Sequence, residues 1–196
     1  MIEFKQYVAK DYTYLLGLEG FSEKLLNTHF ALYQGYVTNV NKISGIIDEL
    51  LKSEKGSTPE FAELKRRFGW EYNGMKLHEM YFENLSKEHQ TLSKESDLYK
   101  QLVEDFGSIE NWLKDFKATS TMRGIGWTVL YFDTQDKRLF NVWVNEHDGG
   151  HLTGMKPILV LDVFEHAFFT DYGSKRVDYI EVYFKSINWK TVESRI

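Results

Sequence analysis

One stretch near the end of the chain constrains the rest: residues 157–172, with the sequence PILVLDVFEHAFFTDY. Its aliphatic run, Ile158 to Leu161, predicts a strand that is buried on both faces. Asp162 ends this run, and His166 follows four residues later. A carboxylate and an imidazole that leave a buried strand at this spacing can converge on one point, so they are a candidate half of a metal site. The alternative is structural: Asp162 caps a helix, and His166 packs beside it.

Composition limits what could complete such a site. The 196-residue chain contains no cysteine, which excludes disulfides and thiolate ligands and leaves any metal to His, Asp and Glu. Hydrophobic residues make up 42% of the chain, as in well-packed globular proteins. The net charge of −5, with acids and bases mixed, gives no basic footprint for nucleic acid. The chain has no apolar run of membrane-spanning length and no apolar segment at its start, so we expect a cytoplasmic protein that binds neither nucleic acid nor membrane.

Two long helices are predicted in the first half of the chain. Residues 21–52 carry apolar side chains at helical spacing, with Ser22 as the N-cap. Thr58 followed by Pro59 predicts the N-cap and first residue of a second helix. The pair Asn73-Gly74 also favours a tight hairpin turn, but no alternating strand pattern flanks it, so we predict helix there. One face of this second helix carries Gly74, His78, Tyr81, Phe82 and Leu85.

The hydrophobic period changes in the second half, after a polar stretch at 86–96. We expect further helices at 97–106, 108–122, around 175–185 and around 189–195, and strands at 126–133, 138–144 and 157–163. The predicted fold is α+β. An N-terminal helical hairpin domain, residues 1–92, packs on a C-terminal domain, residues 93–196, with a three-stranded antiparallel sheet and helices. The metal site is expected between the two domains.

The histidines strengthen the metal hypothesis. His29 and His78 each lie on the apolar stripe of a predicted helix. A single histidine on such a face is more often a packed core residue than a ligand. Two of them on adjacent helices, together with Asp162 and His166, predict three imidazoles and one carboxylate, a set that suits Fe, Mn, Zn or Co. His89 lies in a charged loop and is expected to be solvated.

At these residues the chain resembles the iron/manganese superoxide dismutase family. The resemblance runs in order from about Phe21 to Arg195, and its most specific part is the block DVFEHA at 162–167. It also includes His29 with Tyr36–Asn39, Asn73-Gly74, Leu77-His78, Phe106–Ser108, Gly124, Gly126-Trp127, Arg176, Tyr179 and Asn188-Trp189.

The resemblance implies a superoxide dismutase that converts superoxide to dioxygen and hydrogen peroxide by one-electron cycling of one Fe or Mn ion per chain, with iron favoured. The implied metal ligands are His29, His78, Asp162 and His166, with water or hydroxide in a fifth position. The implied pocket residues are the aromatic side chains Tyr36, Trp127 and Phe164. A homodimer or tetramer is also implied, in which Glu165 reaches across the interface to His166 of the partner subunit.

One departure from the family concerns the residue beside the bound solvent. Many iron members carry a glutamine at the position of Gly74, whereas manganese-type members have glycine there and supply a glutamine from the loop before the third strand. Here that loop contains His147, fifteen residues before Asp162, as in members of archaeal and metal-tolerant type. We therefore expect His147 to contact the solvent and to tune the reduction potential. The alternative is a solvated loop histidine.

Two further departures concern the subunit interface and the first helix. The family's His–Tyr pair between subunits corresponds to Tyr33 and Phe169, which cannot make the same hydrogen bond. The family usually separates its first ligand from its gateway tyrosine by eight residues, but His29 and Tyr36 are seven apart. Because a regular helix turns about 100° per residue, seven steps return Tyr36 to within about 20° of His29, whereas eight require a π-bulge. We predict a regular helix over 29–36 with Tyr36 facing the pocket; in the alternative, Tyr33 is the gateway residue and Tyr36 packs in the core.

Two other functional classes are compatible with parts of this pattern. A non-enzymatic structural or interaction protein on the same fold predicts that ligands are lost, but all four are present. A mononuclear non-haem iron oxygenase needs two or three open metal positions, which four protein ligands do not leave. An assay with superoxide, combined with metal analysis, separates the three classes.

Overall fold

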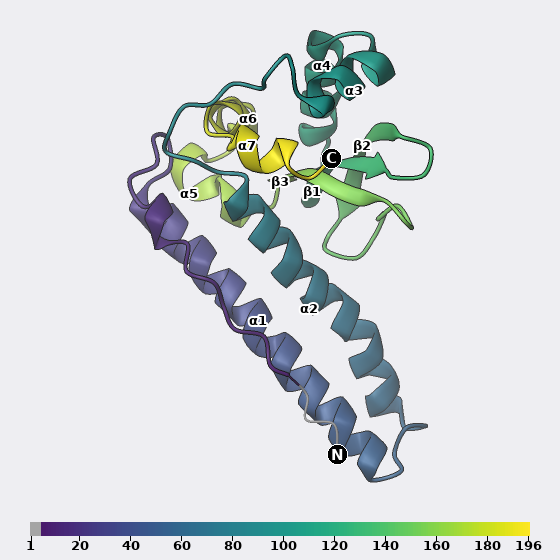
Figure 1. The fold of residues 1–196 in the computed structure, drawn as a ribbon. Coiled ribbons are helices and arrows are strands. Elements are labelled where there is room, and N and C mark those ends of the chain that lie inside the picture. Colours follow the sequence, from purple (N-terminus) through teal and green to yellow (C-terminus); the bar gives the residue numbers. More distant parts are fainter. Residues whose placement is uncertain (1–4) are drawn as a thin grey trace.

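The computed structural model describes residues 5–196. Two long helices, α1 (Glu23–Lys52) and α2 (Pro59–Glu83), lie side by side and extend away from the sheet and the shorter helices (Figure 1). The Ser22 side chain caps α1, and the Thr58 side chain caps α2, with Pro59 in its first turn. Both caps are the predicted ones. The Asn73-Gly74 pair lies within α2, so the prediction of helix over hairpin is confirmed.

The second half contains a three-stranded antiparallel sheet in the order β2-β1-β3. Its elements are α3 (Asp97–Phe106), α4 (Ile109–Ser120), β1 (Gly126–Asp133), β2 (Arg138–Asn145), β3 (Lys156–Asp162), α5 (Phe169–Tyr172), α6 (Arg176–Lys185) and α7 (Trp189–Glu193). Single 3-10 turns lie at Thr13–Leu15 and Glu165–Ala167. The predicted α+β class is confirmed, and the predicted strand at 157–163 is shifted by one residue.

The sheet and α2 are joined by buried polar contacts that position the site. Ile158, Leu159, Val160 and Leu161 are all fully buried, as the aliphatic run predicts. At the end of α2, the Asn84 amide donates to the Val160 carbonyl oxygen at 3.0 Å. The Tyr183 hydroxyl donates to the same oxygen at 2.7 Å. The first bond fixes the C-terminal end of α2 against β3, and the second fixes α6 against the same strand.

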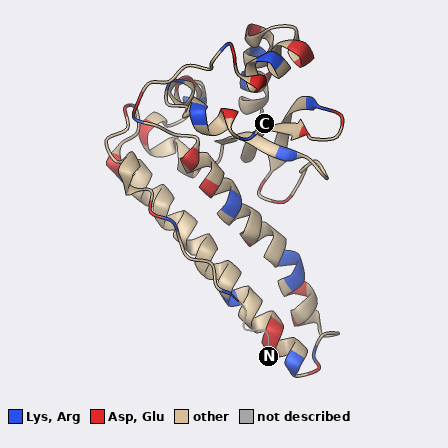
Figure 2. Ribbon diagram, in the orientation of Figure 1, with Lys and Arg blue, Asp and Glu red and all other residues tan. Residues whose placement is uncertain are grey.

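The distribution of charged residues and the apolarity of the helices bear on binding to nucleic acid and membranes. Figure 2 shows acidic and basic residues interspersed along α2 and over the second half of the molecule. None of the helices formed by residues 5–196 combines the length and the apolarity needed to span a membrane.

Candidate metal centre

The four predicted ligands come together from four different elements. His29 lies on α1, His78 on α2, Asp162 at the end of β3, and His166 in the 3-10 turn that follows. Asp162 Oδ2 lies 3.1 Å from Nε2 of both His29 and His166, and 3.7 Å from Nε2 of His78. One donor atom from each residue lies within 4.8 Å of the other three. The residues that the sequence separates by up to 137 positions therefore form one cluster.

Hydrogen bonds outside the cluster aim these side chains inward. The second carboxylate oxygen of Asp162 accepts the Phe164 N–H at 2.8 Å. His78 Nδ1 lies 2.6 Å from the Gly74 carbonyl oxygen, which can only accept, so the proton is on Nδ1 and the Nε2 lone pair faces the cluster. Fixing a ligand histidine through its other nitrogen is a common device in metal sites.

The ionisation of the cluster suits a metal ion. Burial alone would raise the pKa of the Asp162 carboxyl, but His166 and His29 beside it hold that pKa well below its usual range. Burial lowers the pKa of His29 and, more strongly, that of His78, so both rings are neutral. His78 Nε2 is buried and has no hydrogen-bond partner among the described residues. Because buried polar atoms are nearly always paired, this atom fits a ligand nitrogen.

His147 is buried beside the cluster, which contradicts the alternative of a solvated loop histidine. Its Nδ1 accepts the Trp127 indole N–H at 3.0 Å, and its Nε2 lies 2.7 Å from the Tyr36 hydroxyl. An indole nitrogen can only donate, so a neutral His147 carries its proton on Nε2 and donates it to Tyr36. Burial lowers the pKa of His147 to about 4, so the neutral form prevails at neutral pH. The Tyr36 O–H proton is left free to point elsewhere.

Aromatic rings surround the four candidate ligands. The rings of Tyr36 and Trp127 each lie 5.0 Å from the His78 ring, centroid to centroid. The Phe164 ring stacks on His166 at 5.1 Å. These are the three predicted wall residues. Burial raises the pKa of Tyr36, so its hydroxyl keeps its proton.

The first helix is regular between its first candidate ligand and the tyrosine. Residues Glu23–Lys52 form an uninterrupted α-helix, so the prediction for 29–36 is confirmed. Tyr33 points away from the cluster: its buried hydroxyl donates to Glu79 Oε1 at 3.1 Å and accepts the Lys10 N–H at 3.0 Å. The structure therefore brings Tyr36, not Tyr33, to the pocket.

Comparison with known proteins supplies the family. A model described as iron/manganese superoxide dismutases, C-terminal domain, matches residues 94–195. A superoxide dismutase [Fe] of Aquifex pyrophilus is 34% identical over 191 residues, which cover 95% of this chain and 89% of that protein. A superoxide dismutase [Mn] 2 of Haloferax volcanii is 35% identical and covers 89% of this chain, 86% of its own length. This chain belongs to the iron/manganese superoxide dismutase family.

The position of the Tyr36 ring accounts for the glycine at position 74, where many iron members of the family carry glutamine. A Cβ atom at Gly74 would lie 2.6 Å from Cδ1 of the Tyr36 ring. The ring therefore occupies the space that a side chain at this position would need, and the polar contact to Tyr36 comes from His147 instead.

Sequence reasoning did not identify His151 and Tyr131, which hold the backbone of His147 in place. His151 Nε2 lies 2.8 Å from the His147 carbonyl oxygen, so it donates there. Its Nδ1 then accepts the Tyr131 hydroxyl at 2.5 Å. The four-residue spacing of the two histidines was the available signal, but it is interpretable only once the loop is known to fold back on itself.

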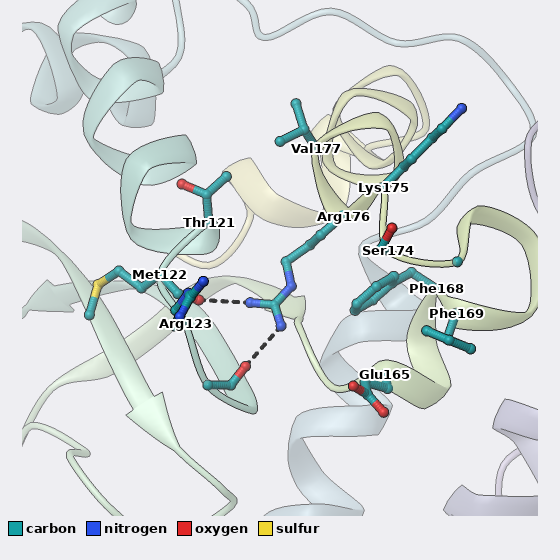
Figure 3. Close-up of a pocket in the computed structure, with 12 residues that line it drawn as sticks. Thr121, Met122, Arg123, Glu165, Phe168, Phe169, Ser174, Lys175, Arg176 and Val177 are labelled. Atoms are coloured by element: carbon teal, nitrogen blue, oxygen red, sulfur yellow. Dashed lines mark hydrogen bonds between the residues drawn. The ribbon is translucent and has the colours of Figure 1, made fainter.

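Glu165, the residue before the candidate ligand His166, lines an exposed hollow (Figure 3). The Arg176 guanidinium in this hollow donates to the carbonyl oxygens of Met122 and Gly124, at 2.8 Å each. Large apolar side chains are exposed around it: Met122, Phe169 and Val177. Within one chain, the Glu165 carboxylate makes no hydrogen bond to a described residue, and the His166 side chain is 21% exposed.

Proposed function

We propose that this chain converts superoxide to dioxygen and hydrogen peroxide with one iron or manganese ion held by His29, His78, Asp162 and His166. The observation that carries the proposal is the buried cluster of three imidazoles and one carboxylate, with Nε2 of His78 unpaired. Membership of the dismutase family supports it. When bound, such an ion supplies the one-electron oxidation and reduction that dismutation requires.

The charge of the ligands favours a small anion. Asp162 contributes the cluster's single negative charge, and neutral imidazoles contribute none. A divalent ion in such a set leaves a net positive site within low-dielectric surroundings, which attracts superoxide although the whole chain carries −5. The rings of Tyr36, Trp127 and Phe164 keep the approach narrow and exclude bulk water.

Tyr36 is the residue we propose to hold a proton at the pocket. Trp127 fixes the His147 tautomer, and His147 Nε2–H donates to the Tyr36 oxygen at 2.7 Å. The Tyr36 O–H is therefore oriented away from His147 and available to an anion in the pocket. Because the reduction of superoxide to hydrogen peroxide consumes one electron and two protons, a fixed proton donor at this position assists that half of the reaction.

We further propose a homodimer formed through the hollow around Glu165. The hollow combines an exposed carboxylate with the exposed apolar side chains of Met122, Phe169 and Val177. A second copy of the chain would place Glu165 of the partner subunit beside the exposed edge of His166. A carboxylate there would orient the ring of a ligand, as in other metal sites.

The metal centre also bears on the division of the chain into domains. Two candidate ligands come from residues 1–92 and two from 93–196, which supports these as the two domains.

The test is reconstitution with three metals. Protein loaded separately with Fe, Mn and Zn should bind one ion per chain in each case, and only the Fe or Mn form should consume superoxide, because zinc has no redox chemistry. One bound Fe or Mn per chain without superoxide consumption would favour the non-enzymatic structural protein instead. Metal analysis of the protein purified from its own host then identifies the physiological ion.

A further inference from the structure

Glu146, the residue before His147, has a left-handed backbone conformation with φ of 51°. Two other non-glycine residues among 5–196 have positive φ, Glu54 and Lys137, and both lie in exposed turns that join consecutive elements. A left-handed conformation is unfavourable for a residue with a Cβ atom and persists where the surroundings hold it. The surroundings of Glu146 therefore need to be identified.

Trp70 of α2 holds the Glu146 side chain. Its indole Nε1–H donates to Glu146 Oε2 at 2.9 Å, across 76 positions of the chain. The Arg67 guanidinium covers the indole at 3.7 Å from a ring centroid. Arg67 in turn donates from Nε to the buried carboxylate of Glu71 at 2.8 Å. Trp70 is thus a fixed point on α2, packed on one face and hydrogen-bonded at its edge.

The same indole contacts both partners of the Tyr36–His147 hydrogen bond. Its ring lies 4.4 Å from the His147 ring at an interplanar angle of 68°. It lies 5.6 Å from the Tyr36 ring. Trp70 therefore forms the wall against which these two side chains approach one another.

The loop that carries His147 makes few other hydrogen bonds to the helices. Asn145 and Gly149 pair with each other through their backbones, and the His147 carbonyl oxygen accepts from His151. Within residues 5–196, two side-chain hydrogen bonds join the 145–151 loop to the helical hairpin: Tyr36 to His147, and Trp70 to Glu146. The second bond anchors the loop one residue before the first.

We propose that Trp70 and Glu146 form a clamp that positions His147 against Tyr36 and the metal centre. Neither is a catalytic residue, because both act through His147. The inference rests on the proposed function, in which His147 lies beside the bound metal. It assigns a role to the left-handed backbone at Glu146: the conformation directs the carboxylate to α2 while the next side chain enters the pocket.

The test removes the clamp from both ends in the metal-loaded enzyme. Trp70→Phe keeps a ring but loses the N–H, and Glu146→Ala loses the acceptor. Each variant should shift the reduction potential of the bound metal in the same direction as His147→Ala does, but by a smaller amount. Each should also lower the activity about fivefold, the effect expected for the loss of one hydrogen bond. Because both changes remove the same bond, the double variant should shift no further than one single variant.

Three further variants separate positioning from stability and charge. Glu146→Gln keeps an acceptor oxygen and should retain the wild-type potential. Glu146→Gly relieves the backbone strain, so it should unfold at a higher temperature than Glu146→Ala yet show the same shifted potential. Asp148→Ala removes a neighbouring exposed carboxylate and should change neither property.

The outcomes distinguish this inference from the proposed function. If His147→Ala shifts the potential and the Trp70 and Glu146 variants do not, with one metal ion bound in each, the clamp is wrong and the role of His147 stands. If none of the variants shifts it, His147→Ala included, both the role of His147 and the clamp are overturned. Because Glu146 is exposed, its variants test the clamp even if Trp70→Phe fails to fold.

Discussion

The Tyr36 hydroxyl lies 2.7 Å from His147 Nε2, across 111 positions of the chain. Trp127 determines the direction of this hydrogen bond, since its indole N–H occupies His147 Nδ1 at 3.0 Å and leaves the His147 proton on Nε2. The arrangement works only while His147 is neutral, because a protonated ring would have a donor facing the donor of Trp127. The protonation of His147 is therefore linked to the stability of the site.

The first prediction concerns this linkage. Burial lowers the pKa of His147 to about 4, from 6.5 in an unfolded chain, against the opposing charge of Asp162. The folded state thus binds fewer protons than the unfolded state between these values, so stability is full above pH 6.5 and declines as pH falls toward 4. The decline from this residue is about 3 kcal/mol. Urea unfolding should be measured for wild type and His147→Gln at pH 7 and at pH 4. Between these values the wild type should lose about 3 kcal/mol more of its free energy of unfolding than the variant. Parallel curves would contradict the assignment.

The second prediction concerns the carboxylate of the cluster. Asp162→Ala should abolish metal binding and superoxide consumption together, because the variant loses the only carboxylate of the cluster. Mutating a residue that only hydrogen-bonds to a metal ligand lowers metal affinity roughly 10–100-fold, and the loss of the ligand Asp162 should exceed this. Asp148→Ala, a change of the same type at an exposed site, should keep one ion per chain. A full metal equivalent in Asp162→Ala would show that the ligand assignment is wrong.

The sequence predicts the cluster because three of the four ligands, all but His166, are marked by a regular hydrophobic pattern. His29 and His78 fall on helical stripes, and Asp162 follows an aliphatic strand. Patterns of this kind carry no information about contacts between irregular segments. The Trp70–Glu146 bond joins a helix to a loop residue whose left-handed backbone is unusual for glutamate. The 3-10 turn at Glu165–Ala167 is shorter than one helical period, so no periodicity could reveal it.

The third prediction uses two glycines of α2. In Gly74→Ala the new Cβ would lie 2.6 Å from Tyr36 Cδ1, so the Tyr36 ring must move and activity should fall while metal content remains. Gly69→Ala meets nothing within 4 Å and should stabilise the protein by about 0.5–1 kcal/mol through helix propensity, with full activity. Activity assays and thermal unfolding of both variants test this; equal activity in the two would show that the Tyr36 position is not critical.

The fourth prediction tests the proposed dimer. Glu165→Ala should shift the chain toward monomer in sedimentation experiments, and its activity should fall on dilution as the His166 ring loses its proposed partner. Glu88→Ala, which removes an exposed acid from the connection after α2, should leave the oligomeric state unchanged. A wild-type protein that is monomeric and fully active at nanomolar concentration would contradict the dimer.

The fifth prediction compares the two tyrosines that the first helix offers to the pocket. Seven regular helical steps from His29, at about 100° each, return Tyr36 to the same face. Tyr33 lies one turn from His29, but its hydroxyl is satisfied by Glu79 and Lys10. The two residues are on one helix and differ in what their hydroxyl groups contact, so their phenylalanine variants form a matched pair.

Tyr36→Phe should lower turnover about tenfold or more, as for the loss of one hydrogen bond to an anion, and retain one metal ion per chain. Tyr33→Phe should keep its turnover and lose about 1–3 kcal/mol of stability, because the buried Glu79 carboxylate and the Lys10 N–H each lose a partner. Steady-state assays at matched metal content, with urea unfolding of both variants, make the comparison. A large loss of turnover in Tyr33→Phe with little change in Tyr36→Phe would transfer the gateway role to Tyr33, because only the hydroxyl that faces the pocket can donate to an anion there.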